Sequence, residues 1–223
     1  MVQFNEIATA SLPANGLLLD AGCGGESRLS AQGRCRMVVG IDREKLEASC
    51  IPGLDENVVG DLRVLPFQTG VFDVVVSWMV VEHLDKPEAC FKELNRVCKD
   101  GGFVILATPN VLHYAVLATK LTPYWFHEWF RKVLLKTSGS SHPTIYTANT
   151  ARKLVSIMQK AGLERVEIRS IDAGPAYLCW LAPAYFAGLV YHRLVNRFSW
   201  LSFLRLTIIG VFQKASSAGG SYR

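Results

Sequence analysis

Short apolar runs alternate with amphipathic stretches along the first half of the chain. The clearest runs cover 17–19, 37–41, 72–76 and 103–107. Between the last two, residues 87–97 carry apolar positions at helical spacing, which predicts a helical crossover between parallel strands. The alternation therefore predicts an α/β fold, in which helices cover both faces of a parallel sheet.

The alternation pauses after residue 110 and resumes near residue 150. Residues 150–162 predict a helix, 163–170 a strand and 204–214 a final strand. Two insertions rich in aromatic residues, 111–146 and 173–203, interrupt this pattern. Because parallel strands present their carboxyl ends at one edge of a sheet, we expect both insertions to open over the same site.

Composition divides the chain at the same place as the hydrophobic pattern. The 223 residues are 50% hydrophobic and 19% charged, which excludes a disordered chain. Residues 1–110 hold 15 of the 19 Asp and Glu, whereas residues 111–223 hold 14 of the 24 Lys and Arg and all seven Tyr. The first half therefore suits a nucleotide-binding core, and the second half suits an anionic or apolar partner.

Cysteine usage and the N-terminus indicate the compartment. The six cysteines, at positions 23, 35, 50, 90, 98 and 179, form no C-x-x-C pair. The first residues lack the basic head and apolar run of a secretory signal. We expect a reducing, cytoplasmic compartment, with membrane association left open.

A glycine-rich turn follows the first predicted strand. Gly22 and Gly24 carry no side chain, so a ligand can lie against the backbone there. A dinucleotide fingerprint would require a third glycine at position 27, which is Ser27. Asp20, at the end of the strand, would repel a pyrophosphate and suits a cationic cofactor. These features argue against a nicotinamide-dependent oxidoreductase.

Two further acids follow the next predicted strands. Asp42 ends the second strand, where a carboxylate can accept both hydroxyl protons of a ribose. Asp61 follows Gly60, where it can accept from an adenine amino group. With Asp20, these acids predict an adenosine-like ligand without phosphates. The alternative is that Asp42 and Asp61 are ordinary turn residues.

These residues resemble those of the class I S-adenosylmethionine-dependent methyltransferases, in particular the small-molecule group that includes the ubiquinone-biosynthesis O-methyltransferases. The resemblance covers 13–110 closely and 146–214 as architecture. It implies a Rossmann-like, seven-stranded, mostly parallel sheet in a single domain, 1–223. In that domain, 13–110 forms the cofactor-binding core, and 147–172 with 204–214 complete the sheet. The motifs that carry it are Leu19–Gly24, Gly40–Asp42, Gly60–Leu62, Phe72–Ser77, Val81–Leu84 and Leu94–Gly102.

The resemblance implies S-adenosylmethionine as cofactor and S-adenosylhomocysteine as product. It places Gly22 and Gly24 at the methionyl part, Asp42 at the ribose, and Ser77 at the methionyl amine. Asp61 and the backbone of Leu62 would hold the adenine. The complete implied cofactor site is Asp20, Gly22, Cys23, Gly24, Asp42, Arg43, Asp61, Leu62 and Ser77.

His83 is the leading candidate for a general base, a role worth about 10²–10⁴-fold where the acceptor is a hydroxyl. Some similar methyltransferases place a base at the matching position. The alternative is that Glu82 and His83 cap the following helix and line the cofactor. Some quinone-type relatives hold magnesium with Glu-x-x-Glu-His, but Met79 stands at the first of these positions, so we expect no metal.

The two insertions supply the candidates for substrate contact. An apolar, aromatic cover suits a hydrophobic small molecule or a lipid as the methyl acceptor. Stacking of bases on these aromatics would instead indicate nucleic acid, but the leucines of the first insertion favour an apolar partner. The candidate substrate residues are His113, Tyr124, Trp125, His142, Tyr146 and Trp180.

Residues 173–203 leave three structures open: a soluble lid, a helix pressed on an anionic membrane surface, or a membrane span. Arg193 and Arg197 share one helix face, where they could grip a phosphate group or complement the end of their own helix. We expect methyl transfer from S-adenosylmethionine, to oxygen by the resemblance. The alternative is a catalytically silent cofactor-binding protein that docks to a membrane or a partner protein. The oligomeric state stays open.

Overall fold

The computed structural model describes residues 1–25, 27, 29, 31, 33–44, 52–121, 144–175, 178–179 and 181–216, with the backbone alone at 119–121. The helices are α1 Val2–Ala10, α2 Pro87–Val97, α3 Tyr114–Leu121, α5 Ala151–Lys160 and α6 Ala182–Arg197, with the 3₁₀ turns η1 Val81–His83 and η3 Ser199–Leu204. The strands are β1 Leu17–Ala21, β2 Met37–Asp42, β3 Glu56–Val59, β4 Phe72–Trp78, β5 Cys98–Pro109, β6 Leu163–Ile171 and β7 Thr207–Lys214.

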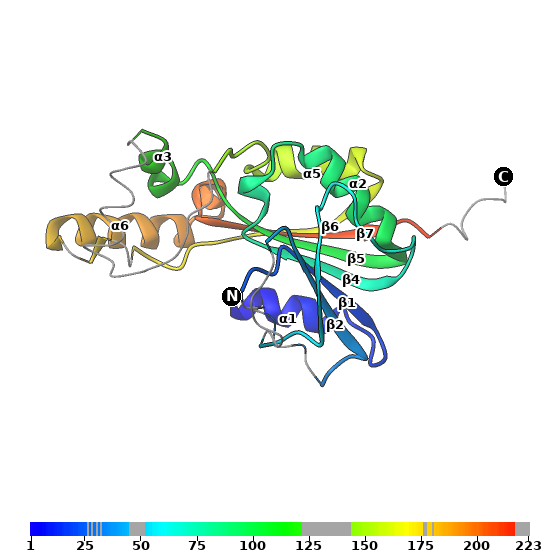
Figure 1. Ribbon diagram of the computed structural model, residues 1–223. Helices are drawn as coiled ribbons and strands as arrows, with labels where there is room; N and C mark the ends of the chain where they lie inside the picture. The colour runs from blue at the N-terminus through cyan, green and yellow to red at the C-terminus, as the bar shows by residue number, and fades with distance from the viewer. Residues whose placement is uncertain are drawn as a thin grey trace, which may run out of the picture.

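The seven strands form one sheet in the order β3-β2-β1-β4-β5-β7-β6 (Figure 1). Neighbouring strands from β3 to β5 are parallel, and β7 runs antiparallel to both β5 and β6. Asp20 lies beside Gly40 of β2 and Val76 of β4, so β1 stands between these two strands. The predicted seven-stranded, mostly parallel sheet is confirmed.

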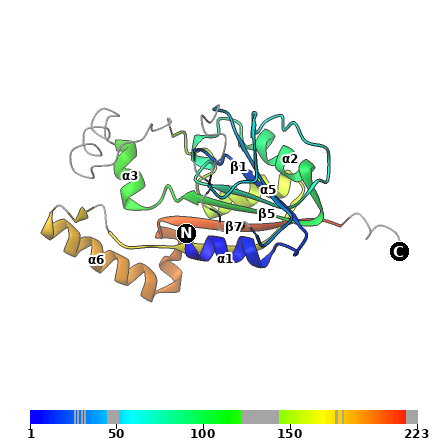
Figure 2. The ribbon, with the colours of Figure 1, turned by 60° about the horizontal axis from the view of Figure 1, so that its bottom comes forward.

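Helices cover both faces of the sheet. One core cluster joins alternate strand residues such as Leu19 and Val75 to the buried faces of α2 and α5. The other joins Leu18 and Val74 to Phe4 of α1. Figures 1 and 2 show α2 and α5 on one face and α1 on the other. Burial of a residue such as Phe4 contributes about 2–3 kcal/mol.

The predicted helices have the expected positions. The helix expected over 87–97 is α2, and the one expected over 150–162 is α5. Thr150 caps α5 because its hydroxyl accepts from the backbone N–H of Lys153 at 3.3 Å. The helix buries Leu154, Ile157 and Met158 on one face, and Gly162 follows its end, as the sequence predicts.

Three element boundaries differ from the sequence expectations. The helix α1 was not anticipated, because only two of its residues, Phe4 and Ala8, are buried. The strand β5 begins at Cys98 rather than 103, because an irregularity at Gly101 is accommodated within it. The final strand begins at Thr207 rather than 204, because Ser199–Leu204 forms a 3₁₀ turn.

Two helices extend beyond the edge of the sheet where β5 and β6 end. The helix α3 follows β5, and α6 follows β6; Figures 1 and 2 show both projecting away from the sheet. Within the part of the chain that the structure describes, no helix is both long and apolar enough to cross a membrane.

Candidate functional site

The glycine turn after β1 is built from two glycines in different surroundings. Gly22 has φ of 84° and Gly24 has φ of 60°, in the region that L side chains rarely adopt. A Cβ at Gly22 would overlap the side chain of Val80, whereas a Cβ at Gly24 would meet no heavy atom within 4 Å. Gly22 therefore serves close packing, and Gly24 faces open space that a ligand can use.

Asp42 lies directly against this turn. Its Oδ2 accepts from the backbone N–H of Gly24 at 2.9 Å, and its Oδ1 accepts from the N–H of Glu44 at 3.1 Å. Each carboxylate oxygen has a second lone pair. The side chain is thus fixed at the end of β2 and can still accept hydrogen bonds from a diol.

Asp20 is almost completely buried, with 4% of its surface exposed. Burial raises the pKa of its carboxyl to about 6; the Ser27 hydroxyl, which donates to Oδ2 at 2.7 Å, opposes the shift, and the nearby charge of Asp42 adds to it. Burial and the same two carboxylates raise the pKa of Cys23 to about 12. Cys23 is therefore a thiol at neutral pH, and Asp20 is an acid held in a low-dielectric site.

A small cavity of about 50 Å³ opens beside Asp20 and the glycine turn. The helix α1 closes one side of it, where the rings of Phe4 and Trp78 meet edge to face at 4.9 Å. The sequence analysis missed this contribution of α1, because its two buried residues give no strong periodicity. The lining residues are Met1, Phe4, Asp20, Gly22, Cys23, Leu29 and Trp78.

Asp61 lies after β3 and forms ion pairs with two arginines. Arg63 Nη2 lies 2.6 Å and Arg43 Nη2 lies 3.3 Å from its Oδ2. The hydrogen bonds from Arg63 lower the pKa of Asp61 to about 2. Asp61 is thus a carboxylate at neutral pH, and both Arg43 and Arg63 contact it. Leu62, between Asp61 and Arg63 in the sequence, is half-buried.

Ser77 is turned into the sheet. Its hydroxyl donates to the backbone carbonyl of Ala21 at 2.8 Å, and the residue is buried. This contact joins the carboxyl ends of β4 and β1 and holds them in register. The contact between Ser77 and a methionyl amine stays a prediction.

Glu82, next to His83, belongs to a buried polar network that sequence reasoning missed. Thr108 donates its hydroxyl to Glu82 Oε2 at 3.2 Å, and Asn149 Nδ2 donates to the Thr108 oxygen at 2.5 Å. Burial raises the pKa of Glu82 to about 7, against the hydrogen bond from Thr108. These three residues come from η1, β5 and the segment just before α5, so no local motif links them.

His83 is half-buried at the end of η1. The N-cap of the following helix α2 is Lys86, so neither Glu82 nor His83 occupies the capping position. The carbonyl of Glu82 accepts from the N–H of Ile145 and of Tyr146, at 2.7 and 3.1 Å. The end of the first insertion, with the substrate candidate Tyr146, is therefore tied to the Glu82–His83 segment.

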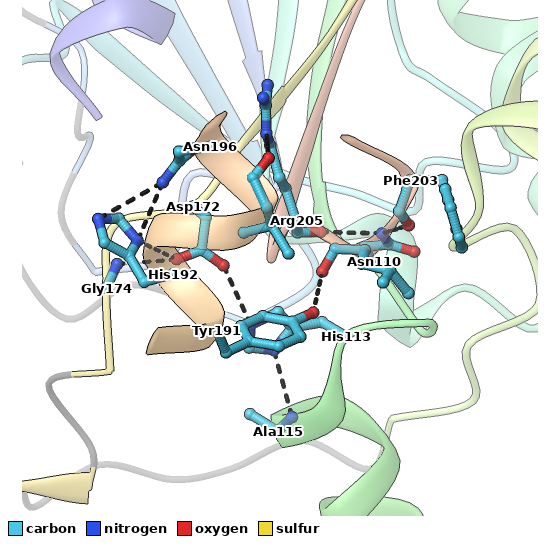
Figure 3. Close-up of polar contacts among 12 residues, drawn as sticks. Asn110, His113, Ala115, Asp172, Gly174, Tyr191, His192, Asn196, Phe203 and Arg205 are labelled. Carbon is cyan, nitrogen blue, oxygen red and sulfur yellow. Dashed lines mark hydrogen bonds and ion pairs between the residues drawn. The ribbon is translucent and has the colours of Figure 1, made fainter. Parts of the chain in front are cut away.

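The substrate candidate His113 is buried in a cluster between the two insertions (Figure 3). The N–H of Ala115 donates to its Nδ1 at 3.2 Å, so Nε2 carries the proton and donates to Asp172 Oδ2 at 3.1 Å. His192 Nδ1 lies 2.7 Å from Asp172 Oδ1. Burial raises the pKa of Asp172, but hydrogen bonds from both histidines outweigh it and hold that pKa below its ordinary value. The cluster ties α3 to α6.

Other candidates can be located only in part. Tyr124, Trp125, His142 and Trp180 lie outside the described residues. Across the described ranges, no group of three or more His, Cys, Asp or Glu is arranged to hold a metal ion.

Comparisons with known proteins agree with this geometry. Residues 19–106 match the family model described as a methyltransferase domain. The chain is 26% identical over 200 residues to a ubiquinone biosynthesis O-methyltransferase of Cereibacter sphaeroides, covering 80% of this chain and 72% of that protein. It is 32% identical over 127 residues to a tRNA (carboxymethyluridine(34)-5-O)-methyltransferase of Arabidopsis thaliana, covering 53% of this chain and 31% of that protein. The chain thus spans about a third of the length of that second relative.

Solved structures share the fold. A S-adenosylmethionine-dependent methyltransferase from Methanosarcina mazei matches with a TM-score of 0.56 and 18% identity, covering 95% of this chain and 98% of that one. The [4+2]-cyclase SpnF matches with a TM-score of 0.62 and 16% identity, covering 96% of this chain and 82% of that one. At this identity the likeness shows the fold alone, and the fold is shared with a protein named for a cyclisation.

Proposed function

Because this chain belongs to the class I S-adenosylmethionine-dependent methyltransferases, we propose that it transfers a methyl group from S-adenosylmethionine to an oxygen of a hydrophobic small molecule or lipid intermediate. The observation that carries the proposal is the glycine turn held against Asp42, with open space above Gly24 and the buried Asp20 beside it. Backbone, diol acceptor and buried acid meet where β1 and β2 end.

The residues present fit the cofactor part by part. Asp42 would accept the ribose hydroxyls, and Asp61 would accept from the adenine amino group in competition with Arg63. Gly24 would let the methionyl part approach the backbone, and Asp20 would favour its positive charge. When bound, the cofactor supplies a methyl group on a sulfonium, which is an electrophile.

The protein's part in the reaction is alignment, exclusion of water and, for a hydroxyl acceptor, removal of one proton. His83 is half-buried and lies next to the Glu82–Thr108–Asn149 network, at the carboxyl ends of β4 and β5. That network holds η1, which contains His83, against β5. We assign His83 the role of proton acceptor from the methyl acceptor.

An oxygen acceptor on an apolar molecule is supported by two features. The ubiquinone biosynthesis O-methyltransferase similar to this chain is named for oxygen methylation in quinone biosynthesis. The second half of this chain, which would cover the acceptor, holds all seven Tyr and four of the five Trp. The other relative is named for tRNA, so nucleic acid is the acceptor class that the assay must separate.

The test is transfer of a labelled methyl group from S-adenosylmethionine into three pools: a lipid extract, an aqueous metabolite extract and total tRNA. The proposal predicts label in an organic-soluble product, lost in the Asp42→Ala variant. Label in tRNA alone would overturn the acceptor class. Retained binding of S-adenosylhomocysteine with no product in any pool would favour the alternative, a catalytically silent cofactor-binding protein.

A further inference from the structure

The outer face of α6 carries a stripe of exposed apolar side chains. Phe186, Val190 and Leu194 are spaced four residues apart and are 65%, 57% and 46% exposed. Residues four apart lie on the same face of a helix. The three side chains therefore point together away from the protein.

The opposite face of α6 is the one that attaches the helix to the domain. Gly188 packs so closely against Pro175 that a Cβ would overlap it, and Val195 is buried. Between them, the Tyr191 hydroxyl donates to the Leu204 carbonyl at 2.6 Å, and its ring lies 5.4 Å from the ring of His113. Because this face is anchored, the outer stripe cannot turn inward without breaking these contacts.

The exposed apolar surface continues past the end of α6. Phe198 follows the helix directly, and its ring lies 6.4 Å from that of Trp200, which is 71% exposed. Phe203 of η3 is also exposed. Single exposed apolar residues are ordinary, but a gathering of large ones marks a surface that meets a partner. The apolar stripe is Phe186, Val190, Leu194, Phe198 and Trp200.

Two arginines of α6 flank the apolar stripe. Arg193 and Arg197 are exposed and lie on the outer half of α6, next to Val190 and Leu194. Residues 173–206 contain no Asp or Glu. A face of aromatic and aliphatic residues with arginines at its side matches a surface that is apolar inside and anionic outside. If a second copy of this chain covered the same face, its own Arg193 and Arg197 would lie near Arg193 and Arg197 of the first copy.

We propose that the apolar stripe, with Arg193 and Arg197, docks this protein on an anionic lipid bilayer, with α6 lying in the plane of the interface. The helix projects beyond the body of the sheet in both ribbon views, so its outer face can reach a flat surface (Figures 1 and 2). Trp200 sits among the apolar residues as an aromatic suited to the headgroup level. The docking does not depend on methyl transfer, since none of these residues belongs to the cofactor site.

Flotation with lipid vesicles tests the proposal directly. The full chain should float with vesicles of phosphatidylcholine and phosphatidylglycerol and float far less with phosphatidylcholine alone. Phe186→Ser with Val190→Ser should lower the bound fraction about tenfold, because two apolar side chains no longer leave water. Arg193→Gln with Arg197→Gln should lower it by a similar factor on anionic vesicles, and raising the salt from about 0.1 M to about 1 M should reproduce that loss.

Matched variants separate docking from general effects. Val64→Ser with Val166→Ser removes two exposed apolar residues elsewhere, and Arg152→Gln with Lys153→Gln removes two exposed charges from α5. Both controls should float like the wild type. The proposal would be overturned if Phe186→Ser with Val190→Ser floated with anionic vesicles as well as the wild type does. It would also be overturned if the wild type floated equally with neutral and anionic vesicles. Light scattering could instead show a dimer of the wild type that Phe186→Ser with Val190→Ser dissociates and the control variants do not. Such a dimer, with no flotation of the wild type, would assign the stripe to contact with a second copy and would also overturn the proposal.

Discussion

The backbone N–H of Gly24 donates to Asp42 Oδ2 at 2.9 Å, which joins the turn after β1 to the end of β2. This hydrogen bond holds the turn and the carboxylate in a fixed position relative to each other. Gly24 presents its backbone, and Asp42 presents a carboxylate that is already oriented. We therefore expect a substitution at either residue to change ligand binding more than it changes the fold.

The two glycines of the turn predict opposite effects. Gly24→Ala should weaken S-adenosylhomocysteine binding about tenfold or more and lower the free energy of unfolding by only about 1–2 kcal/mol, the cost of a positive φ. Gly22→Ala should lower the free energy of unfolding by more, about 2–4 kcal/mol, because its Cβ would also overlap Val80. Calorimetry and urea unfolding measure the two effects. Equal losses of stability in both variants would contradict this division.

Asp20 predicts a pH dependence of stability. Its folded pKa is raised to about 6, above the ordinary value of 3.8, so the folded state holds the proton more tightly than the unfolded state. The contribution of Asp20 to the free energy of unfolding is fully present below the ordinary pKa and is lost as the pH rises through about 6. Asp20→Asn should therefore raise the free energy of unfolding above about pH 6, by about 1–3 kcal/mol relative to wild type. Urea unfolding of both proteins across this pH range checks the prediction. Identical pH profiles for wild type and Asp20→Asn would show that the pKa of Asp20 is not raised in the folded state.

The same substitution should weaken the binding of S-adenosylmethionine. The ionised carboxylate favours a cation in a buried site, and an amide does not. The loss should be larger for S-adenosylmethionine than for S-adenosylhomocysteine, whose sulfur is neutral. An equal loss for both ligands would show that Asp20 does not sense the sulfonium.

His83 is tested by two substitutions with different meanings. As a proton acceptor, His83 should be essential for turnover, so His83→Ala and His83→Gln should both lower kcat about a hundredfold. Neither should change the affinity for S-adenosylhomocysteine more than a few-fold. Near wild-type turnover in His83→Gln would show that the side chain only packs or donates hydrogen bonds. Loss of turnover in Glu82→Gln alone would move the role to its neighbour.

The Asp172 cluster predicts a structural effect without a cofactor effect. Asp172→Ala leaves two histidines without their hydrogen-bond acceptor and should lower the free energy of unfolding by about 2–4 kcal/mol. Because the folded pKa of Asp172 is lowered, its contribution is present above its ordinary pKa and is lost as the pH falls below that value. Unfolding at neutral and acidic pH checks the sign. The affinity for S-adenosylhomocysteine should stay within a few-fold of wild type, since the cluster lies between α3 and α6.

Much of the fold could be predicted because its signals are local. The runs at 17–19 and 72–76 lie in buried strands, and residues 87–97 form a helix. Burial of one face gives each of these elements a regular pattern of apolar residues along the sequence. The carboxylates Asp20 and Asp42 also lie beside the glycine turn, because neighbouring parallel strands end at one edge. Strand alternation and strand-end position are both visible in sequence.

The remainder depends on contacts between distant residues. His113 and Asp172 are 59 positions apart and meet because they follow β5 and β6, which lie on either side of β7. Ser77 lies at a strand end as expected, but its hydroxyl donates to the Ala21 carbonyl. The spacing of residues in the sequence does not predict the direction of a side chain. Asp61 likewise pairs with Arg43, 18 positions away and directly after the neighbouring strand β2, which a strand-end pattern does not predict. Partner choice among polar side chains is decided by tertiary structure.

The central claim is that the glycine turn and Asp42 bind S-adenosylmethionine. Titration calorimetry of the purified protein with S-adenosylhomocysteine, beside NAD and beside Asp42→Ala, tests it most directly, with Glu164→Gln as a surface control. The account predicts binding of S-adenosylhomocysteine alone, weakened by about 2–4 kcal/mol in Asp42→Ala and unchanged in the control. Binding of NAD in preference, or full affinity in Asp42→Ala, would contradict it.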